Sequence, residues 1–169
     1  MIGIFKSKNE KILSEVIAFE GRLNQALMPL LKESDKLIAT KGALMAMAIN
    51  IALYFLKIRN LQNYEEIFKH LTTHFSSVFG SVVEKISHGK ISREIATSSF
   101  LREMQDTYED YAVTLAKSVL NSEEALQGCL TIFLEKSGRV FTSEMERLQA
   151  VIILGFELQN LMKRFRSIL

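Results

Sequence analysis

The chain has 169 residues, of which 48% are hydrophobic and 24% are charged. This is enough apolar material for a sizeable core, so the composition excludes a disordered tail and a small disulfide-held scaffold. Twenty-one Lys and Arg residues against nineteen Asp and Glu residues give a formal charge of +2, which is too balanced for the basic surface of a nucleic-acid binder. We therefore expect one domain, residues 1–169, and no nucleic-acid partner.

The spacing of apolar residues predicts helices along most of the chain. Only one proline and eight glycines interrupt it, and the apolar residues recur at intervals of three and four. Several predicted helices begin with a Ser or Asn followed three residues later by a Glu, the pattern of a capping box. The four pairs are Ser7 with Glu10, Asn63 with Glu66, Asn121 with Glu124 and Ser143 with Glu146.

Six helices are predicted, and the first contains Pro29. Because its apolar face stays in phase across Pro29, we expect a kink at this residue and not the end of the helix. The fifth helix is expected to end at Gly138, which suits a left-handed cap. Short connections place successive helices antiparallel, so the predicted fold is all-α, an up-and-down bundle of about six helices. The predicted ranges are 8–33, 35–59, 63–87, 92–120, 122–137 and 143–167.

The second helix contains an uncharged run, residues 42–56, between Lys41 and Lys57. The run has 15 residues. A membrane-spanning helix needs about 20, and shorter runs are typical of the central helix of a soluble bundle. We expect this helix to lie at the centre of the bundle, with membrane insertion as the alternative.

The cysteine content and the first residues predict a cytoplasmic location. Cys129 is the single cysteine and falls on an apolar helix face, which is typical of a buried, unreactive thiol in a reducing compartment. The opening residues MIGIFKSKNEK have four mostly apolar positions followed by charge, the wrong order and length for a secretory signal.

One helix face carries residue types that bind metals. Glu66, His70 and His74 lie at successive intervals of four, and two histidines at this spacing can chelate a divalent metal. They lie on the side of the predicted helix away from its apolar face, and the chain has no HExxH arrangement. We therefore expect an exposed pair of histidines and no metal site, with a metal-dependent enzyme as the weakest hypothesis.

Three polar residues interrupt otherwise apolar helix faces. Glu20 has mainly apolar neighbours at helical spacing, Asn50 is the strongly polar residue of the uncharged run, and Arg147 lies on the apolar side of the last helix. Burying any of them alone costs free energy, so each needs a partner, and Arg147 is a candidate partner for Glu20. We expect an inward cluster that forms a structural network or lines a small pocket between helices.

The charges are distributed unevenly along the chain. Residues 1–60 contain nine basic and five acidic side chains, whereas residues 91–138 contain four and eight. Such segments can present complementary patches to a second copy, or they can be two solvated faces. The mean hydropathy of +0.13 and six apolar faces leave more apolar surface than one small bundle can cover.

No catalytic constellation accompanies these features. We therefore expect a non-enzymatic, cytoplasmic bundle without a cofactor that acts by protein association, as a homodimer. The alternative is a bundle that binds an apolar small molecule or cofactor between its helices.

Overall fold

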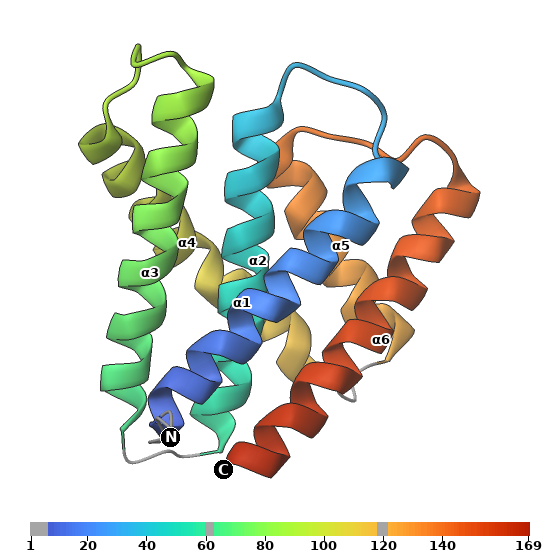
Figure 1. Ribbon diagram of the computed structural model, residues 1–169. Coiled ribbons are helices and arrows are strands. Elements are labelled where there is room, and N and C mark those ends of the chain that lie inside the picture. Colours follow the sequence, from blue (N-terminus) through green and yellow to red (C-terminus); the bar gives the residue numbers. More distant parts are fainter. Residues whose placement is uncertain (1–6, 60–62, 118–121) are drawn as a thin grey trace, which may run out of the picture.

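A computed structural model describes residues 7–59, 63–117 and 122–169. Within these residues the chain forms six α-helices and no β-strand, which confirms the predicted all-α bundle. The helices alternate in direction along the chain (Figure 1). They are α1 (Lys8–Leu27), α2 (Leu37–Ile58), α3 (Tyr64–Ile86), α4 (Arg93–Lys117), α5 (Glu123–Ser137) and α6 (Glu144–Ile168).

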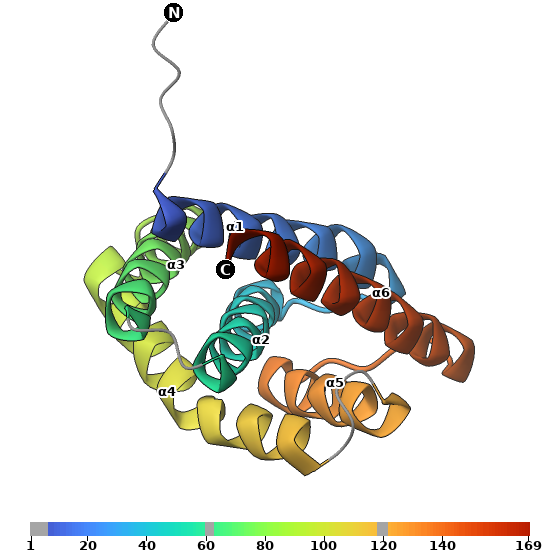
Figure 2. The ribbon, with the colours of Figure 1, turned by 90° about the horizontal axis from the view of Figure 1, so that it is seen from below.

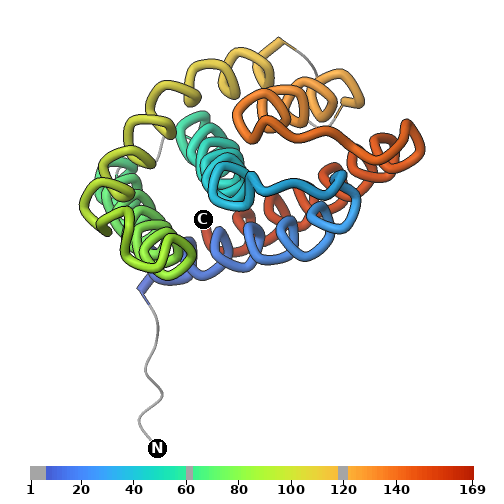
Figure 3. The backbone as a smooth tube through the Cα atoms, turned by 90° about the horizontal axis from the view of Figure 1, so that it is seen from above, coloured from blue at the N-terminus to red at the C-terminus, as the bar shows by residue number. Residues whose placement is uncertain are grey.

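Helix α2 lies at the centre of the bundle. Seen end-on, it is surrounded by a ring of the other five helices (Figure 2 and Figure 3), and it packs directly against α1, α3, α4 and α5. The ring closes where α1 packs against α6. Residues 42–53 of α2 are all buried, so the apolar character of this helix on every side follows from its central position.

Among the described residues, α2 is the one helix long and apolar enough to cross a membrane by length and composition. Of its most apolar stretch, 72% is buried inside the bundle. The expected central position of this helix is therefore confirmed.

Two predicted caps are present and one is wrong. Ser7 and Glu10 form a complete capping box at α1, and the Ser143 hydroxyl accepts from the backbone N–H of Glu146 at α6. The Asn63 side chain does not cap α3, because its amide instead donates to the side-chain oxygen of Asn9 on α1, at 2.6 Å. At α5 the cap is Ser122, and the predicted cap Asn121 lies outside the described residues.

The expected kink at Pro29 is wrong, because α1 ends at Leu27. The chain forms one 3-10 turn over Met28–Leu30 and becomes extended at Leu31. Proline lacks a backbone N–H and crowds the carbonyl four residues earlier, which favours this ending. Leu31 then pairs with Phe141 in an isolated antiparallel bridge, so the chain leaving α1 is joined to the chain entering α6.

Arg139 holds the same two connections together. Its side chain is buried, and its guanidinium donates to the Lys32 carbonyl at 2.6 Å and to the Thr40 hydroxyl at 3.2 Å. Gly138, immediately before it, adopts a φ of 61° and ends α5 as predicted. These contacts fix where α6 begins and therefore how it lies against α5.

Candidate functional site

A row of large apolar side chains lies exposed along the outer face of α6. We call this row the α6 stripe, and its members are Met145 (72% exposed), Leu148 (43%), Ile152 (71%) and Phe156 (62%). Their spacings of three, four and four residues place all four on one side of the helix. A single exposed apolar residue is common, but a continuous row is a candidate interaction surface.

The stripe exists because α6 has two apolar faces. The inner face packs into the bundle through buried residues such as Leu154, Leu158 and Leu161. At 100° per residue these positions lie roughly 120–180° from Ile152 around the helix axis, so one helix cannot bury both faces against one bundle. The sequence contains this signal as a second apolar row, but the inner face alone is enough to explain a bundle helix.

A groove runs beside the stripe, between α5 and α6. It has a volume of about 560 Å³. Its floor and walls are largely apolar, and Glu123 and Gln159 supply its polar groups. The lining residues are Glu123, Leu126, Leu148, Val151, Ile152, Gly155, Phe156 and Gln159. Three members of the stripe therefore also form a wall of this groove, which makes one continuous apolar surface.

Asn50 is the one member of the expected polar cluster that lies in the core. Its side chain is fully buried, and its amide donates to the Met104 carbonyl and to the Thr107 hydroxyl, both on α4 and both at 3.0 Å. Its side-chain oxygen has no partner. Asn50 therefore sets the position of α2 against α4, and neither Glu20 nor Arg147 is among its hydrogen-bond partners.

Glu20 and Arg147 do not form the expected pair. Glu20 is half-buried on α1, where burial raises the pKa of its carboxyl and the nearby Lys41 on α2 partly opposes that shift. Arg147 is exposed, and its guanidinium lies 3.7 Å from Glu144 one turn away. The expected inward position of Arg147 is wrong, because the first buried residue of α6 is Ala150 and the helix begins at the edge of the bundle (Figure 2).

The ion pair that does join two helices involves other residues. The Arg22 guanidinium on α1 donates to the Glu157 carboxylate on α6, with the nitrogen and oxygen atoms 2.5 Å apart. Glu157 is nearly buried, so this charge needs its partner. Arg22 and Glu157 border the apolar faces of their helices, and this position is the only signal in the sequence for the pair.

The candidate metal ligands Glu66, His70 and His74 do not form a site. Glu66 and His70 are exposed, and the half-buried His74 ring packs edge-on against Phe75, with the ring centroids 5.4 Å apart. Within the described parts of the chain, no group of three or more His, Cys, Asp or Glu side chains could hold a metal ion.

A second groove, between α2 and α4, contains aromatic residues. Its volume is about 730 Å³, and Tyr54, Lys57 and Tyr108 supply polar groups to largely apolar walls. The Lys57 ammonium lies 5.6 Å from the centre of the Tyr108 ring, within the range of a cation–π interaction. The remaining lining residues are Ile58, Gln105, Glu109, Ala112, Val113 and Ala116.

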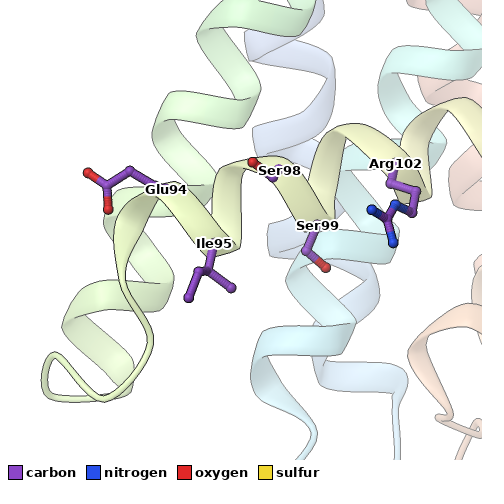
Figure 4. A pocket seen from close by; sticks show the side chains of 5 residues that line it. All are labelled: Glu94, Ile95, Ser98, Ser99 and Arg102. Atoms are coloured by element: carbon purple, nitrogen blue, oxygen red, sulfur yellow. The ribbon is translucent and has the colours of Figure 1, made fainter.

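The outer face of α4 has a third hollow, of about 400 Å³, shown in Figure 4. Ile95, which is 64% exposed, lies there beside Glu94, Ser98, Ser99 and Arg102. All five side chains come from one helix, and Ile95 is surrounded by polar groups. Ile95 is the one apolar residue that lines this hollow, in contrast to the continuous α6 stripe.

The chain matches no protein-family model, no curated protein and no solved structure.

Proposed function

We propose that this chain is a non-enzymatic helical bundle that acts by protein association, as a homodimer formed through the α6 stripe. The observation that carries the proposal is the exposure of Met145, Ile152 and Phe156 in one row, each more than 60% accessible to water. Burying such side chains against a second copy removes their apolar area from water, and this is the main driving force of association.

The size of the surface sets the expected strength of the dimer. The stripe spans three turns of helix, or about 16 Å at 1.5 Å per residue. A typical stable complex buries roughly 800 Å² and about 20–30 residues on each partner, many more than the four residues of the stripe. We therefore expect a dimer with micromolar affinity, whose apolar contacts resist high salt.

The proposed location is the cytoplasm. Cys129 is 1% exposed, and burial raises the pKa of its thiol to about 12. Such a thiol stays protonated and unreactive at neutral pH, which suits a reducing compartment.

The test compares two isoleucines of similar exposure. Ile152→Glu places a charge in the centre of the stripe, whereas the control Ile95→Glu places the same charge on α4. We expect the first variant to sediment as a monomer at concentrations where the control and the unaltered chain are dimers. Circular dichroism should show the same helix content in all three. An Ile152→Glu chain that dimerises normally would refute the proposed interface.

The groove between α2 and α4 supports a second candidate function, the binding of an apolar small molecule. Its volume lies within the range of ligand sites, and apolar walls with a few polar groups are typical of such sites. Lys57 would contact an acidic group of the ligand, and Tyr54 and Tyr108 would pack against its apolar body.

This candidate is tested with the dye 1-anilinonaphthalene-8-sulfonate, which has an apolar body and one anionic group. We expect Ala112→Leu, which fills the groove, to weaken dye binding, and Ile152→Glu to leave binding at the groove unchanged. Equal dye fluorescence in the Ala112→Leu variant and the unaltered chain would exclude the groove as a ligand site.

A further inference from the structure

We infer that the two copies pair their α6 stripes antiparallel, around a two-fold axis that passes between Leu148 and Ile152. This inference rests on the proposed function and specifies the surface of the partner. Met145 of one copy then faces the partner's Phe156, and Leu148 faces the partner's Ile152.

The spacing of the stripe allows this pairing. Read forward, its members are separated by three, four and four residues, and read backward by four, four and three. The stripe of one copy therefore matches the reversed stripe of the second copy to within one residue, or about 1.5 Å along the helix. A reversed copy covers all four members of the stripe, and each copy uses the same patch, as a closed two-fold interface requires.

Charge decides between antiparallel and parallel pairing. Lys163 and Arg166 continue the face of the stripe toward the end of α6, and Glu144 lies in its first turn. A parallel pair places Lys163 and Arg166 against their own copies, so that like charges meet. An antiparallel pair in this register removes those like-charge contacts, because Lys163 and Arg166 then lie beyond the start of the partner's α6, and it also opposes the two helix dipoles.

Closure favours the pairing of two stripes over the insertion of the stripe into the other apolar groove. If the stripe inserted into the groove between α2 and α4 of the next copy, each molecule would keep one free stripe and one free groove. Such head-to-tail contacts build open chains unless a ring closes. The antiparallel pair uses both stripes at once and stops at two copies.

The test uses two single-cysteine additions on the stripe, Met145→Cys and Phe156→Cys. Both positions are more than 60% exposed, so the replacements leave the core intact. The native Cys129 is buried and does not compete for disulfide formation. Each variant is oxidised alone and in an equal mixture, and covalent dimers of twice 19.2 kDa are separated without reductant. Phe156→Cys mixed with Ile95→Cys is the control, because Ile95 lies on α4.

We expect the mixture of Met145→Cys and Phe156→Cys to form the covalent dimer at least fivefold faster than either variant alone or the control mixture. If each variant instead links to itself faster than to the other, the pairing is parallel and the inference is wrong, although the proposed dimer stands. If no mixture links while the unaltered chain sediments as a dimer, the stripe is not the contact and the inference also fails. A monomeric unaltered chain contradicts the proposed function itself.

Discussion

Asn50 is a fully buried polar residue that satisfies only part of its hydrogen-bonding capacity. Its amide reaches α4, but its side-chain oxygen has no partner. The hydroxyl of Thr107, one of its acceptors, also donates to the Glu103 carbonyl at 2.8 Å, so it keeps a hydrogen bond if Asn50 is removed. Asn50 therefore contributes more to the register between α2 and α4 than to the free energy of unfolding.

Two substitutions at Asn50 test this account. Asn50→Leu keeps the volume and removes the unpaired oxygen, so we expect the free energy of unfolding to change by less than about 1.5 kcal/mol. Asn50→Asp buries a carboxyl without a cationic partner and should cost about 3 kcal/mol or more. Urea unfolding of both variants provides the measurement. A loss in Asn50→Leu as large as that in Asn50→Asp would show that the two hydrogen bonds are indispensable.

Glu20 predicts a dependence of stability on pH. Burial raises the pKa of its carboxyl in the folded chain above the ordinary value of 4.5. Well below pH 4.5 the carboxyl is protonated in both the folded and the unfolded chain, so its burial as a charge does not lower the free energy of unfolding. As the pH rises through 4.5 and then through the raised pKa, the unfolded chain releases its proton more readily, and the folded chain loses stability.

Glu20→Gln removes this cost. We expect the variant to match the unaltered chain near pH 4 and to be more stable at pH 7, by less than about 1 kcal/mol because water screens a half-buried group. Urea unfolding at the two pH values measures the difference. A large loss of stability in the variant at pH 7 would show instead that Glu20 has a strong ion pair.

Glu20 and Arg147 show what the spacing of apolar residues along a helix can and cannot predict. The spacing of apolar residues gives the side of a helix on which a residue lies, and both residues do lie toward the apolar side. The spacing does not show which turns of a helix pack against the core. Arg147 lies in the first turns of α6, before its first buried residue, Ala150. Nor does the spacing show which helices meet, so the pairing of Arg22 with Glu157 could not be predicted.

At the scale of elements, the helices α3 and α4 approach closely at Gly80. A Cβ atom added there would lie 2.5 Å from the Thr97 hydroxyl and 3.0 Å from the Arg93 carbonyl. The carbonyl belongs to the backbone and cannot move without shifting α4. Gly21, in contrast, is an exposed residue in the middle of α1, with nothing within 4 Å of an added Cβ.

The same substitution should therefore have opposite effects at these glycines. We expect Gly80→Ala to destabilise the bundle by about 1–3 kcal/mol, because the two helices must separate. Gly21→Ala should stabilise it by up to about 1 kcal/mol, because alanine favours a helix. Thermal unfolding followed by circular dichroism measures both. If Gly80→Ala is as stable as Gly21→Ala, then α3 and α4 do not approach each other closely at Gly80.

The helices themselves were predictable, because local signals mark both their starts and their apolar faces. Ser7, Ser143 and Gly138 bound their helices as expected. The errors arose where a distant contact competed with a local one. Asn63 bonds to Asn9 and not to its own helix. The segment after Pro29 leaves the helix and pairs with the segment after α5.

For the whole molecule, the central helix explains the high hydrophobicity only in part. Residues 42–53 are buried by the surrounding ring, which accounts for their apolar character. The α6 stripe faces outward on that ring, and none of the residues that the structure describes covers it. The sequence predicted an excess of apolar surface, but only the arrangement of the ring placed it on α6.

Sedimentation velocity of the unaltered chain, at tens of micromolar and in both low and high salt, tests the central claim most directly. Association through apolar surface does not depend on unscreened charges, so we expect a species of twice 19.2 kDa under both conditions. A monomer at both salt concentrations, or a dimer that dissociates as the salt rises, would contradict association through the α6 stripe.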